Sequence, residues 1–414
     1  MEKRIDAAFA NYVPKVEEVP VEKGLSRVIA EDILSGIDLP PADISAMDGY
    51  ALRSSALGLA SASNPIKLKI KGSLFPNNLY STIEAEIMDD GTAYYVATGA
   101  PIPKGCDVVV RIEETKLNEK ENTVTIMERV PKGKNVAPKG EDIHIGETLV
   151  ERGQILNSQN VAMLIGIGKE KIKVFRVPTV GIISIGNELR TLEDPVKGGS
   201  LVNNYAHLMA GFLSALGANP ILLGIAKDNQ EEIAAIIKRG VDECDMVITI
   251  AGSSVGARDF TPNAILSLKD SSMMFHGMKL VPIRPAGLAL VSNKPVIIVP
   301  GHAVSATLTF FTLVSPILNH LAGLPSTSRR VILRAKVEGG EFSNDRSIEA
   351  LELVSLRKKG DTDYIAVPLG WGSNLIQTLS KANGFVRVKP GQKITESEEV
   401  VVQLFGGFEL ERII

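Results

Sequence analysis

The chain has 414 residues, of which 44% are hydrophobic and 22% charged, and its formal net charge is −3. This length is too great for one compact core and predicts two to four domains, and the composition excludes wholesale disorder. The slight acidic excess argues against a nucleic-acid-binding protein, which usually carries a basic surplus.

Residues 1–40 open with an amphipathic segment and, together with residues 141–177, are predicted to form a linking domain. Residues 41–140 contain short β-type runs separated by Gly, Pro and Asn, which predicts a mostly β insertion domain. These runs are 66–70, 93–97, 108–112 and 123–126.

Residues 178–325 alternate between short apolar runs and segments with helical spacing, which predicts a doubly wound, mostly parallel sheet with helices on both faces. From about residue 329 only strand-length runs recur, so residues 326–414 are predicted to form a small all-β, barrel-like domain. The fold class is therefore α/β multidomain. In the central part, the predicted strands are 180–185, 220–225, 246–250 and 295–299, and the predicted helices are 205–216, 230–243 and about 303–322.

Cysteines are too few for a disulfide framework, since only Cys106 and Cys244 occur, and a reducing, cytoplasmic setting fits them. The five histidines show no spacing typical of zinc ligands. The first residues lack the apolar core of a signal peptide. The longest apolar stretch, 296–318, is interrupted by prolines and a glycine, so we expect a buried strand and helix and no membrane span.

Small and acidic residues follow the predicted parallel strands. Ligands of such sheets bind outside the carboxyl ends of the strands, so these residues are predicted to share one rim. Gly252 and Gly256 would let backbone N–H groups approach an anion, and Ser253 and Ser254 add hydroxyl donors.

Three carboxylates, those of Glu188, Asp228 and Asp259, fall on the same predicted rim. Unneutralised, they would repel one another and any anion, whereas Mg²⁺ takes oxygen ligands and bridges to phosphate oxygens. The simpler interpretation is that Glu188 and Asp228 cap helices, that the glycine loop is a tight turn and that Asp259 pairs with Arg258 on the surface. Their joint position at successive strand ends favours a site.

Six segments resemble, in this order, those of the molybdopterin molybdenumtransferases, a family that includes the bacterial enzyme and the E domain of gephyrin. The resemblance runs from about residue 5 to 320, and the family also has a β domain at its C-terminus. Each segment alone is modest, and six in order are highly specific. The segments are 45–51, 98–103, 140–142, 186–189, 253–256 with Asp259, and 300–306.

The resemblance implies a transferase of molybdenum cofactor biosynthesis that inserts molybdate, or tungstate, into adenylyl-molybdopterin and releases AMP. It implies a homodimer whose site lies between the doubly wound domain of one chain and the β insertion of the other, and a molybdopterin adenylyltransferase as a possible partner. The residues carried over as catalytic are Asp48, Asp142, Glu188, Asp228 and Asp259, the last three as Mg²⁺ ligands. Those carried over as substrate-binding are Thr98, Gly99, Gly252, Ser253, Ser254, Gly256, Arg284, Pro300, Gly301 and Ser305.

The chain departs from the family pattern where the anions are expected to bind. The run Lys-Pro-Gly-Lys-Pro is replaced by residues 284–288, in which Arg284 keeps the first cation and the second lysine is lost. Ala251 stands at the first glycine of the family's glycine loop, if that loop is not one residue shorter. Two alternative functions stay open: an adenylyltransferase-like activity on molybdopterin, and a non-catalytic scaffold related to the enzyme.

Overall fold

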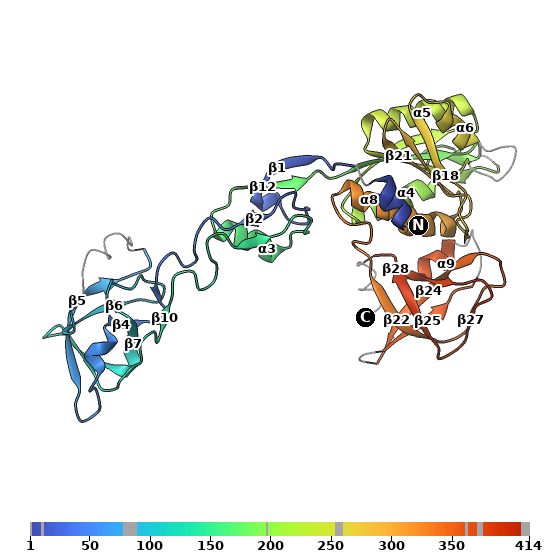
Figure 1. Ribbon diagram of the computed structural model, residues 1–414. Helices are drawn as coiled ribbons and strands as arrows, with labels where there is room; N and C mark the ends of the chain where they lie inside the picture. Colours follow the sequence, from blue (N-terminus) through green and yellow to red (C-terminus); the bar gives the residue numbers. More distant parts are fainter. Residues whose placement is uncertain are drawn as a thin grey trace. The chain divides into compact units, whose positions relative to one another are not determined.

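The computed structural model describes residues 2–9, 12–77, 89–195, 198–252, 260–360, 363–370 and 376–406. The chain divides into two compact units (Figure 1). Unit 1 comprises Met1–Glu18, Ser26–Ala30 and Lys173–Ile414, and unit 2 comprises Val19–Leu25 and Glu31–Ile172. The division falls within strands β1 (Val16–Pro20) and β12 (Lys171–Phe175).

Unit 1 contains a six-stranded central sheet of order β16-β13-β17-β21-β20-β18. The first four strands are parallel, which confirms the predicted doubly wound sheet, and β20 and β18 are antiparallel additions that the sequence pattern did not indicate. The strands are β13 (Thr179–Ile185), β16 (Asn219–Ala226), β17 (Met246–Ile250), β18 (Ser271–His276), β20 (Gly287–Val291) and β21 (Lys294–Val299).

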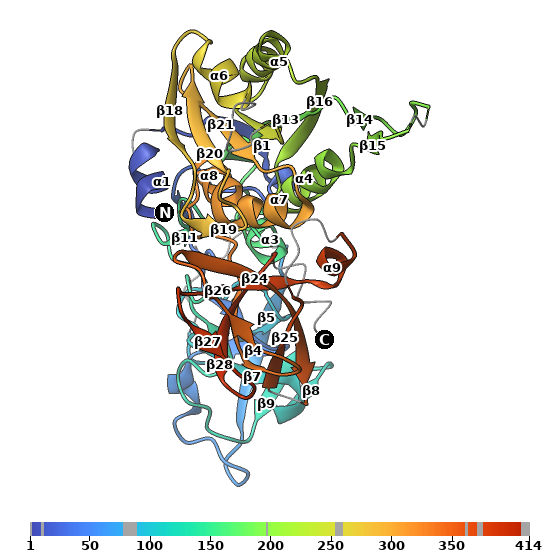
Figure 2. The ribbon, with the colours of Figure 1, turned by 90° about the vertical axis from the view of Figure 1, so that its right-hand side faces the viewer.

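Helices cover both faces of this sheet because its strands are apolar on both sides (Figures 1 and 2). Val180 and Ile182 of β13 belong to a buried cluster with α4, α7 and α8, whereas Ile183 and Ile185 belong to a second cluster with α5 and α6. The helices are α4 (Asn204–Ala215), α5 (Gln230–Glu243), α6 (Phe260–Leu266), α7 (Ala303–Thr309) and α8 (Ser315–Leu321). The first cluster also takes in Ile5 of the short N-terminal helix α1 (Glu2–Ala8).

The predicted long helix is present as α7 and α8 joined by a π-helical turn, Phe310–Val314. Within the residues that the structure describes, Ala303–Leu321 is the one helix long and apolar enough to cross a membrane, with a mean hydropathy of 1.3. However, 89% of this stretch is buried inside the protein, as expected for a core helix.

The C-terminal part of unit 1 is a closed five-stranded barrel, in which β24 pairs with both β25 and β26. It confirms the predicted barrel-like domain, and β19 (Leu280–Val281) adds to β24 in parallel. The prediction of an all-β domain is wrong in one element, because residues 376–381 form helix α9 (Ile376–Lys381). The barrel strands are β22 (Ile332–Val337), β24 (Glu349–Lys359), β25 (Asp363–Pro368), β26 (Gly384–Val388) and β28 (Glu399–Leu404).

Unit 2 contains a mixed six-stranded sheet of order β7-β4-β6-β5-β9-β8, built from the β-type runs expected in the insertion. Residues 158–166 form helix α3 (Ser158–Gly166), which begins at Asn157 because that side chain caps the N–H of Asn160. The strands are β4 (Gly49–Leu52), β5 (Ile66–Leu74), β6 (Thr92–Val96), β7 (Val108–Arg111), β8 (Thr115–Asn118) and β9 (Thr123–Ile126).

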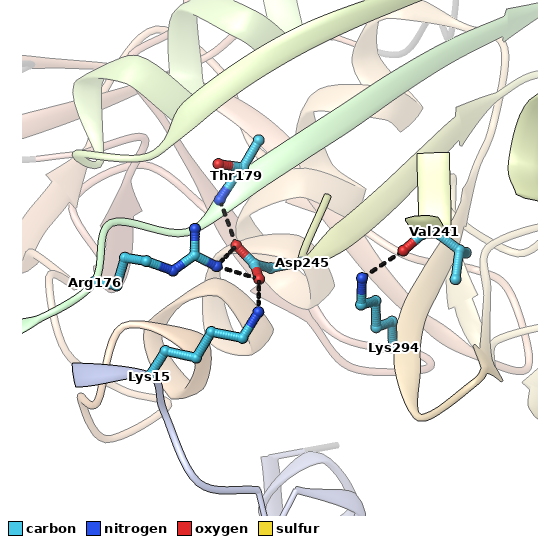
Figure 3. A network of polar contacts seen from close by, with 6 residues as sticks. All are labelled: Lys15, Arg176, Thr179, Val241, Asp245 and Lys294. Atoms are coloured by element: carbon cyan, nitrogen blue, oxygen red, sulfur yellow. Dashed lines mark hydrogen bonds and ion pairs between the residues drawn. The ribbon is translucent and has the colours of Figure 1, made fainter. Parts of the chain in front are cut away.

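A buried carboxylate in unit 1 anchors both chain segments that lead to and from unit 2 (Figure 3). Asp245, which directly precedes β17, accepts hydrogen bonds from Arg176 at 2.5 and 2.6 Å, Lys15 at 3.2 Å and the Thr179 N–H at 2.9 Å. Its side chain is only 9% exposed. Lys15 precedes β1 and Arg176 follows β12, so one anion holds both segments to the central sheet.

Candidate functional site

The carboxyl ends of four parallel strands meet at one edge of the central sheet. Because β16, β13, β17 and β21 are neighbours in that order, the turns that follow them lie side by side. The start of β20 joins this edge, since Gly287 pairs with Ile298 near the end of β21. The rim that the sequence predicts is therefore assembled from residues 186–189, 227–229, 251–252 and 300–302.

A cavity of about 420 Å³ opens at this edge. Glu188, Ala251 and Gly301 line it from three of the strand ends. The buried Ser184 donates a hydrogen bond of 2.7 Å to Oδ1 of Asn203 and so fixes a second polar side chain in the wall. The remaining lining residues are Leu189, Leu201, Val202, Asn204, Tyr205, Ile250, His302 and Ile376.

The two described carboxylates of the rim are not helix caps. Helix α5 is capped by Asn229, whose side chain accepts the Glu232 N–H at 2.9 Å, and Asp228 is left outside that cap. The Asp228 N–H donates to Oδ1 of Asn187 at 3.2 Å, which ties the β16 and β13 ends together. Glu188 is exposed and is followed by a strand rather than a helix. The capping interpretation therefore fails for both residues.

Glu188 also lines a second cavity of about 420 Å³, together with Arg190 and Lys227. The Arg190 guanidinium donates to the carbonyls of Thr191 at 3.0 Å and Asp194 at 2.9 Å, which fixes its position. Acidic and basic side chains thus line the same cavity, a mixture that suits a substrate carrying both phosphate and a bound cation.

The backbone after β17 takes a conformation that glycine normally supplies. Ala251 has φ +70° and Gly252 has φ +69°, both in the left-handed region. The adjacent turn after β21 is packed tightly against it, because a Cβ at Gly301 would lie 2.6 Å from Cβ of Ala251. The two turns can approach this closely only while residue 301 has no side chain.

We expect the Gly301→Ala variant to be destabilised by about 1–3 kcal/mol, because its new methyl group overlaps Ala251. The free energy of unfolding from urea denaturation measures the effect. Gly211→Ala is the matched control: a Cβ at that exposed position of α4 has nothing within 4 Å, so it should be neutral or stabilising. Equal stabilities for the two variants would contradict the packing described.

Gly252 begins the glycine loop that the sequence singles out. A Cβ there would lie 2.5 Å from Oγ1 of the buried Thr261, so a side chain is excluded at this position. Four further predicted residues lie outside the described residues: Ser253, Ser254, Gly256 and Asp259. In the parts of the chain that are described, no three His, Cys, Asp or Glu side chains gather as a metal site.

The other substrate-binding candidates of unit 1 differ in accessibility. Arg284 is exposed, in the segment before β20, and its carbonyl accepts the Met278 N–H at 2.8 Å. Pro300 is buried beside Gly301, which lines the cavity. Ser305 lies inside α7 and is 1% exposed, so its hydroxyl is not at the described surface.

In unit 2 the structure joins two of the predicted segments. The Asp48 carboxylate accepts hydrogen bonds from the Thr98 N–H at 2.7 Å and the Thr98 hydroxyl at 2.8 Å. These bonds hold the pKa of Asp48 below its ordinary value, so the carboxylate is ionised at neutral pH. Gly99, with φ +81°, donates its N–H to the Ser45 carbonyl at 2.7 Å and closes the turn.

Asp142 lies in a separate turn of unit 2. Its N–H donates to the Leu39 carbonyl at 3.0 Å, and its side chain is exposed. The turn requires glycine at position 140, where φ is +75° and a Cβ would lie 2.5 Å from Nδ1 of His144. Asp48 and Asp142 are thus both exposed carboxylates carried on rigid turns.

Comparison with known proteins agrees with this arrangement over nearly the whole chain. Three family models match in order: the MoeA N-terminal region, domains I and II (residues 1–168); a probable molybdopterin-binding domain (181–320); and the MoeA C-terminal region, domain IV (337–405). A crystal structure of a molybdopterin biosynthesis MoeA protein from Pyrococcus horikoshii is 32% identical, with 98% of each chain covered and a TM-score of 0.86. The chain belongs to the MoeA family.

Other relatives of this MoeA-family chain carry more specific names. A molybdopterin molybdenumtransferase from Haemophilus influenzae is 29% identical over 401 residues, covering 95% of both chains. A putative molybdopterin biosynthesis protein from Methanocaldococcus jannaschii is 28% identical over 395 residues, covering 94% of this chain and 91% of its own length.

Sequence reasoning missed several residues that line the cavity of this MoeA-family chain. Ile376 comes from the C-terminal part of unit 1, and no pattern along the chain connects it to strand ends more than 70 residues earlier. Asn203 had a usable signal, since it lies between β15 (Leu201–Val202) and the start of α4. This strand pairs with β14 (Leu189–Arg190) outside the central sheet, so the polar residue before α4 is the signal, and the order of the central strands does not place it.

We expect the Thr98→Ala variant to raise the pKa of Asp48 toward 3.8 without reaching it, because one of two hydrogen bonds to the carboxylate is lost and the backbone N–H remains. A ¹³C NMR titration of the aspartate carboxyl carbons measures the change. Thr98→Ser retains a hydroxyl and should leave the pKa as it is in the wild type. A rise of equal size in both variants would contradict a role for the hydroxyl.

Proposed function

We propose that this protein inserts molybdate into adenylyl-molybdopterin and releases AMP. It is a transferase of molybdenum cofactor biosynthesis, in keeping with its family. The observation that supports the insertion reaction is the cavity at the carboxyl edge of the central sheet, which Glu188 lines together with the close-packed turns at Ala251 and Gly301. Such an edge is where doubly wound sheets bind nucleotides.

The carboxylates of the rim are the kind of ligand that Mg²⁺ prefers. Glu188 and Asp228 supply carboxylate oxygens from neighbouring strands, and Mg²⁺ is commonly held by one or two carboxylates plus substrate phosphates. Asp259 is the third proposed ligand. When bound, the ion would neutralise charge that develops on the leaving phosphate.

The chain's own residues would bind and orient two anionic substrates. Gly301 packs on Ala251, which brings the backbone turns after β17 and β21 together in the wall of the cavity, beside the space that an oxyanion would occupy. Arg284 supplies an exposed cation at the same edge, where the family pattern also has a cation. Molybdate and tungstate have the same charge and shape, so the proposed site would bind either.

The proposal includes a homodimer in which Asp48 and Asp142 of one protomer serve the central domain of the other. Its support is that Asp48 is exposed and that its carboxylate is ionised and held in place by two hydrogen bonds from Thr98, as suits a side chain that serves a site outside unit 2. Mixed dimers of the Asp48→Asn and Glu188→Gln variants test it, since each dimer would contain one intact site. Recovery of up to a quarter of the wild-type AMP release supports the arrangement, and no recovery contradicts it.

The reaction itself is tested by incubating the purified protein with adenylyl-molybdopterin, molybdate and Mg²⁺ and measuring AMP by chromatography. AMP release that depends on molybdate, or on tungstate in a parallel arm, is the expected result. Net synthesis of the adenylate from ATP and molybdopterin would instead identify an adenylyltransferase. A cytoplasmic location is part of the proposal, and both cysteines are free thiols, as suits a reducing compartment.

A further inference from the structure

A third cavity, which is apolar and has a volume of about 360 Å³, adjoins the cavity of the candidate site. The two cavities share Asn204, Tyr205 and Ile376 in their walls and are therefore direct neighbours. The residues that support the proposed function, Glu188, Asp228, Gly252 and Gly301, do not line this apolar cavity. The other lining residues are Leu208, Phe212, Ala303, Leu379, Ser380, Ala382 and Phe405.

Two of the residues that line this cavity, Phe212 and Phe405, belong to a cluster of contacting aromatic rings with Phe311. Phe405 stacks on Phe311 with ring centroids 5.1 Å apart, and Phe212 meets Phe311 edge-on at 5.0 Å. Phe311 and Phe405 are buried, at 5% and 2% exposure, and belong to the main core cluster of unit 1. The cavity is therefore pre-formed on its inner side, and a flat group placed there would not need to reorder the core.

The outer side of the cavity is formed by α9 of the C-terminal part, which packs against α7. Ile376 is 51% exposed although it stands between two cavities, and Leu379 is half-buried beside it. An apolar side chain left exposed between the cavity that Glu188 lines and this apolar cavity loses that exposure when a ligand fills both.

We propose that the apolar cavity binds a planar heteroaromatic ring of the substrate, with α9 forming one wall of the substrate site. The inference rests on the proposed function, because it assumes a ligand whose anionic part occupies the rim. Adenylyl-molybdopterin contains two fused-ring systems, a planar purine and a pyranopterin whose pyrimidinone ring is planar, and the planar part of either has the shape and apolar faces that this cavity suits. The C-terminal barrel thereby becomes part of the binding site.

The test fills the cavity and measures ring binding directly. Leu379→Trp is compared with the wild type by calorimetry, with AMP in one arm and free pterin in the other. At least a tenfold weaker affinity for one of the two is expected, and the affected arm identifies the ring. Leu266→Trp is the matched control, since Leu266 is 52% exposed on α6, which packs on the opposite face of the sheet.

A second variant guards against misfolding of the first. Ile376→Ala truncates a side chain that is 51% exposed, so its melting temperature should stay close to that of the wild type while affinity for the same ring falls severalfold. The inference is overturned if the wild type binds neither ring, if both α9 variants bind as the wild type does, or if Leu266→Trp weakens binding equally.

The same samples separate this inference from the proposed function. If the wild type releases no AMP from adenylyl-molybdopterin but loses ring affinity in Leu379→Trp, the proposed reaction fails and the ring site stands. If the wild type releases AMP and both α9 variants bind rings normally, the reaction stands and the ring site fails.

Discussion

The Glu188→Gln variant should release AMP from adenylyl-molybdopterin roughly a hundredfold more slowly than the wild type. Glu188 lines both cavities at the carboxyl edge of the sheet and supplies one of the two described carboxylates of the rim. Glutamine has nearly the same shape, so the substitution removes charge and a good metal ligand while it keeps the packing. The rate of AMP formation at saturating molybdate measures the loss.

Two further measurements show whether the loss of rate arises at the site or from a less stable fold. Glu188 is exposed, so the melting temperature of the variant should equal that of the wild type. The Mg²⁺ concentration for half-maximal rate should rise, because a ligand oxygen with full charge is gone. Glu193→Gln, the same change at an exposed position of the neighbouring turn, is the control and should behave as the wild type. A normal rate in Glu188→Gln would remove this carboxylate from the mechanism.

The Asp245→Asn variant should lose about 3 kcal/mol of stability at neutral pH, a loss typical of breaking a buried, multiply bonded ion pair. The change removes the negative charge that Arg176, Lys15 and the Thr179 N–H all contact, and the Arg176 guanidinium loses its two bonds to the carboxylate. Urea denaturation at pH 7 measures it. Asp242→Asn is the control: Asp242 is exposed and pairs with the exposed Lys238, so a change within about 0.5 kcal/mol is expected.

The stability difference between Asp245→Asn and the wild type should depend on pH. Burial by itself raises the pKa of Asp245, but the hydrogen bond from Thr179 and the cations of Lys15 and Arg176 outweigh it, so the folded-state pKa lies below the ordinary value of 3.8. A depressed pKa contributes stability that is complete above the unfolded-state value and is lost as the pH falls through the folded-state value. The difference should therefore be constant from neutral pH to about pH 5 and shrink below pH 4. A constant difference down to pH 3 would show that the charge of Asp245 is not what stabilises the fold.

The parallel part of the fold followed from the sequence, because strands buried on both faces are continuous apolar runs that end in Gly and polar residues. The hairpin of β20 and β21 did not follow. Its two-residue turn, Ser292 and Asn293, has φ +49° and +61°, which a hairpin turn of this kind requires, yet it lacks the glycine that normally marks it. Helix α9 was missed because six residues are too few for a helical period to be read.

The candidate site, like the fold, could be predicted from the sequence only in part. Glu188, Asp228, Gly252 and Gly301 were placed correctly on one edge, since strand order alone decides where their turns meet. Ile376 could not be placed, because its position depends on how the barrel packs on α7, which only tertiary contacts determine. The backbone conformation of Ala251 could not be predicted either. Its φ of +70° accompanies close packing against Gly301, and neither composition nor periodicity indicates it.

The deeply buried helix 303–321 has a consequence for biosynthesis of the protein. Part of what covers it, Phe385 and Phe405 in the same core cluster, lies some 80 residues further along the chain and leaves the ribosome on the order of 4–16 s later. During that interval a segment hydrophobic enough to enter a lipid bilayer is only partly buried. Nascent chains truncated before the barrel should therefore depend on a chaperone, whereas full-length chains should not.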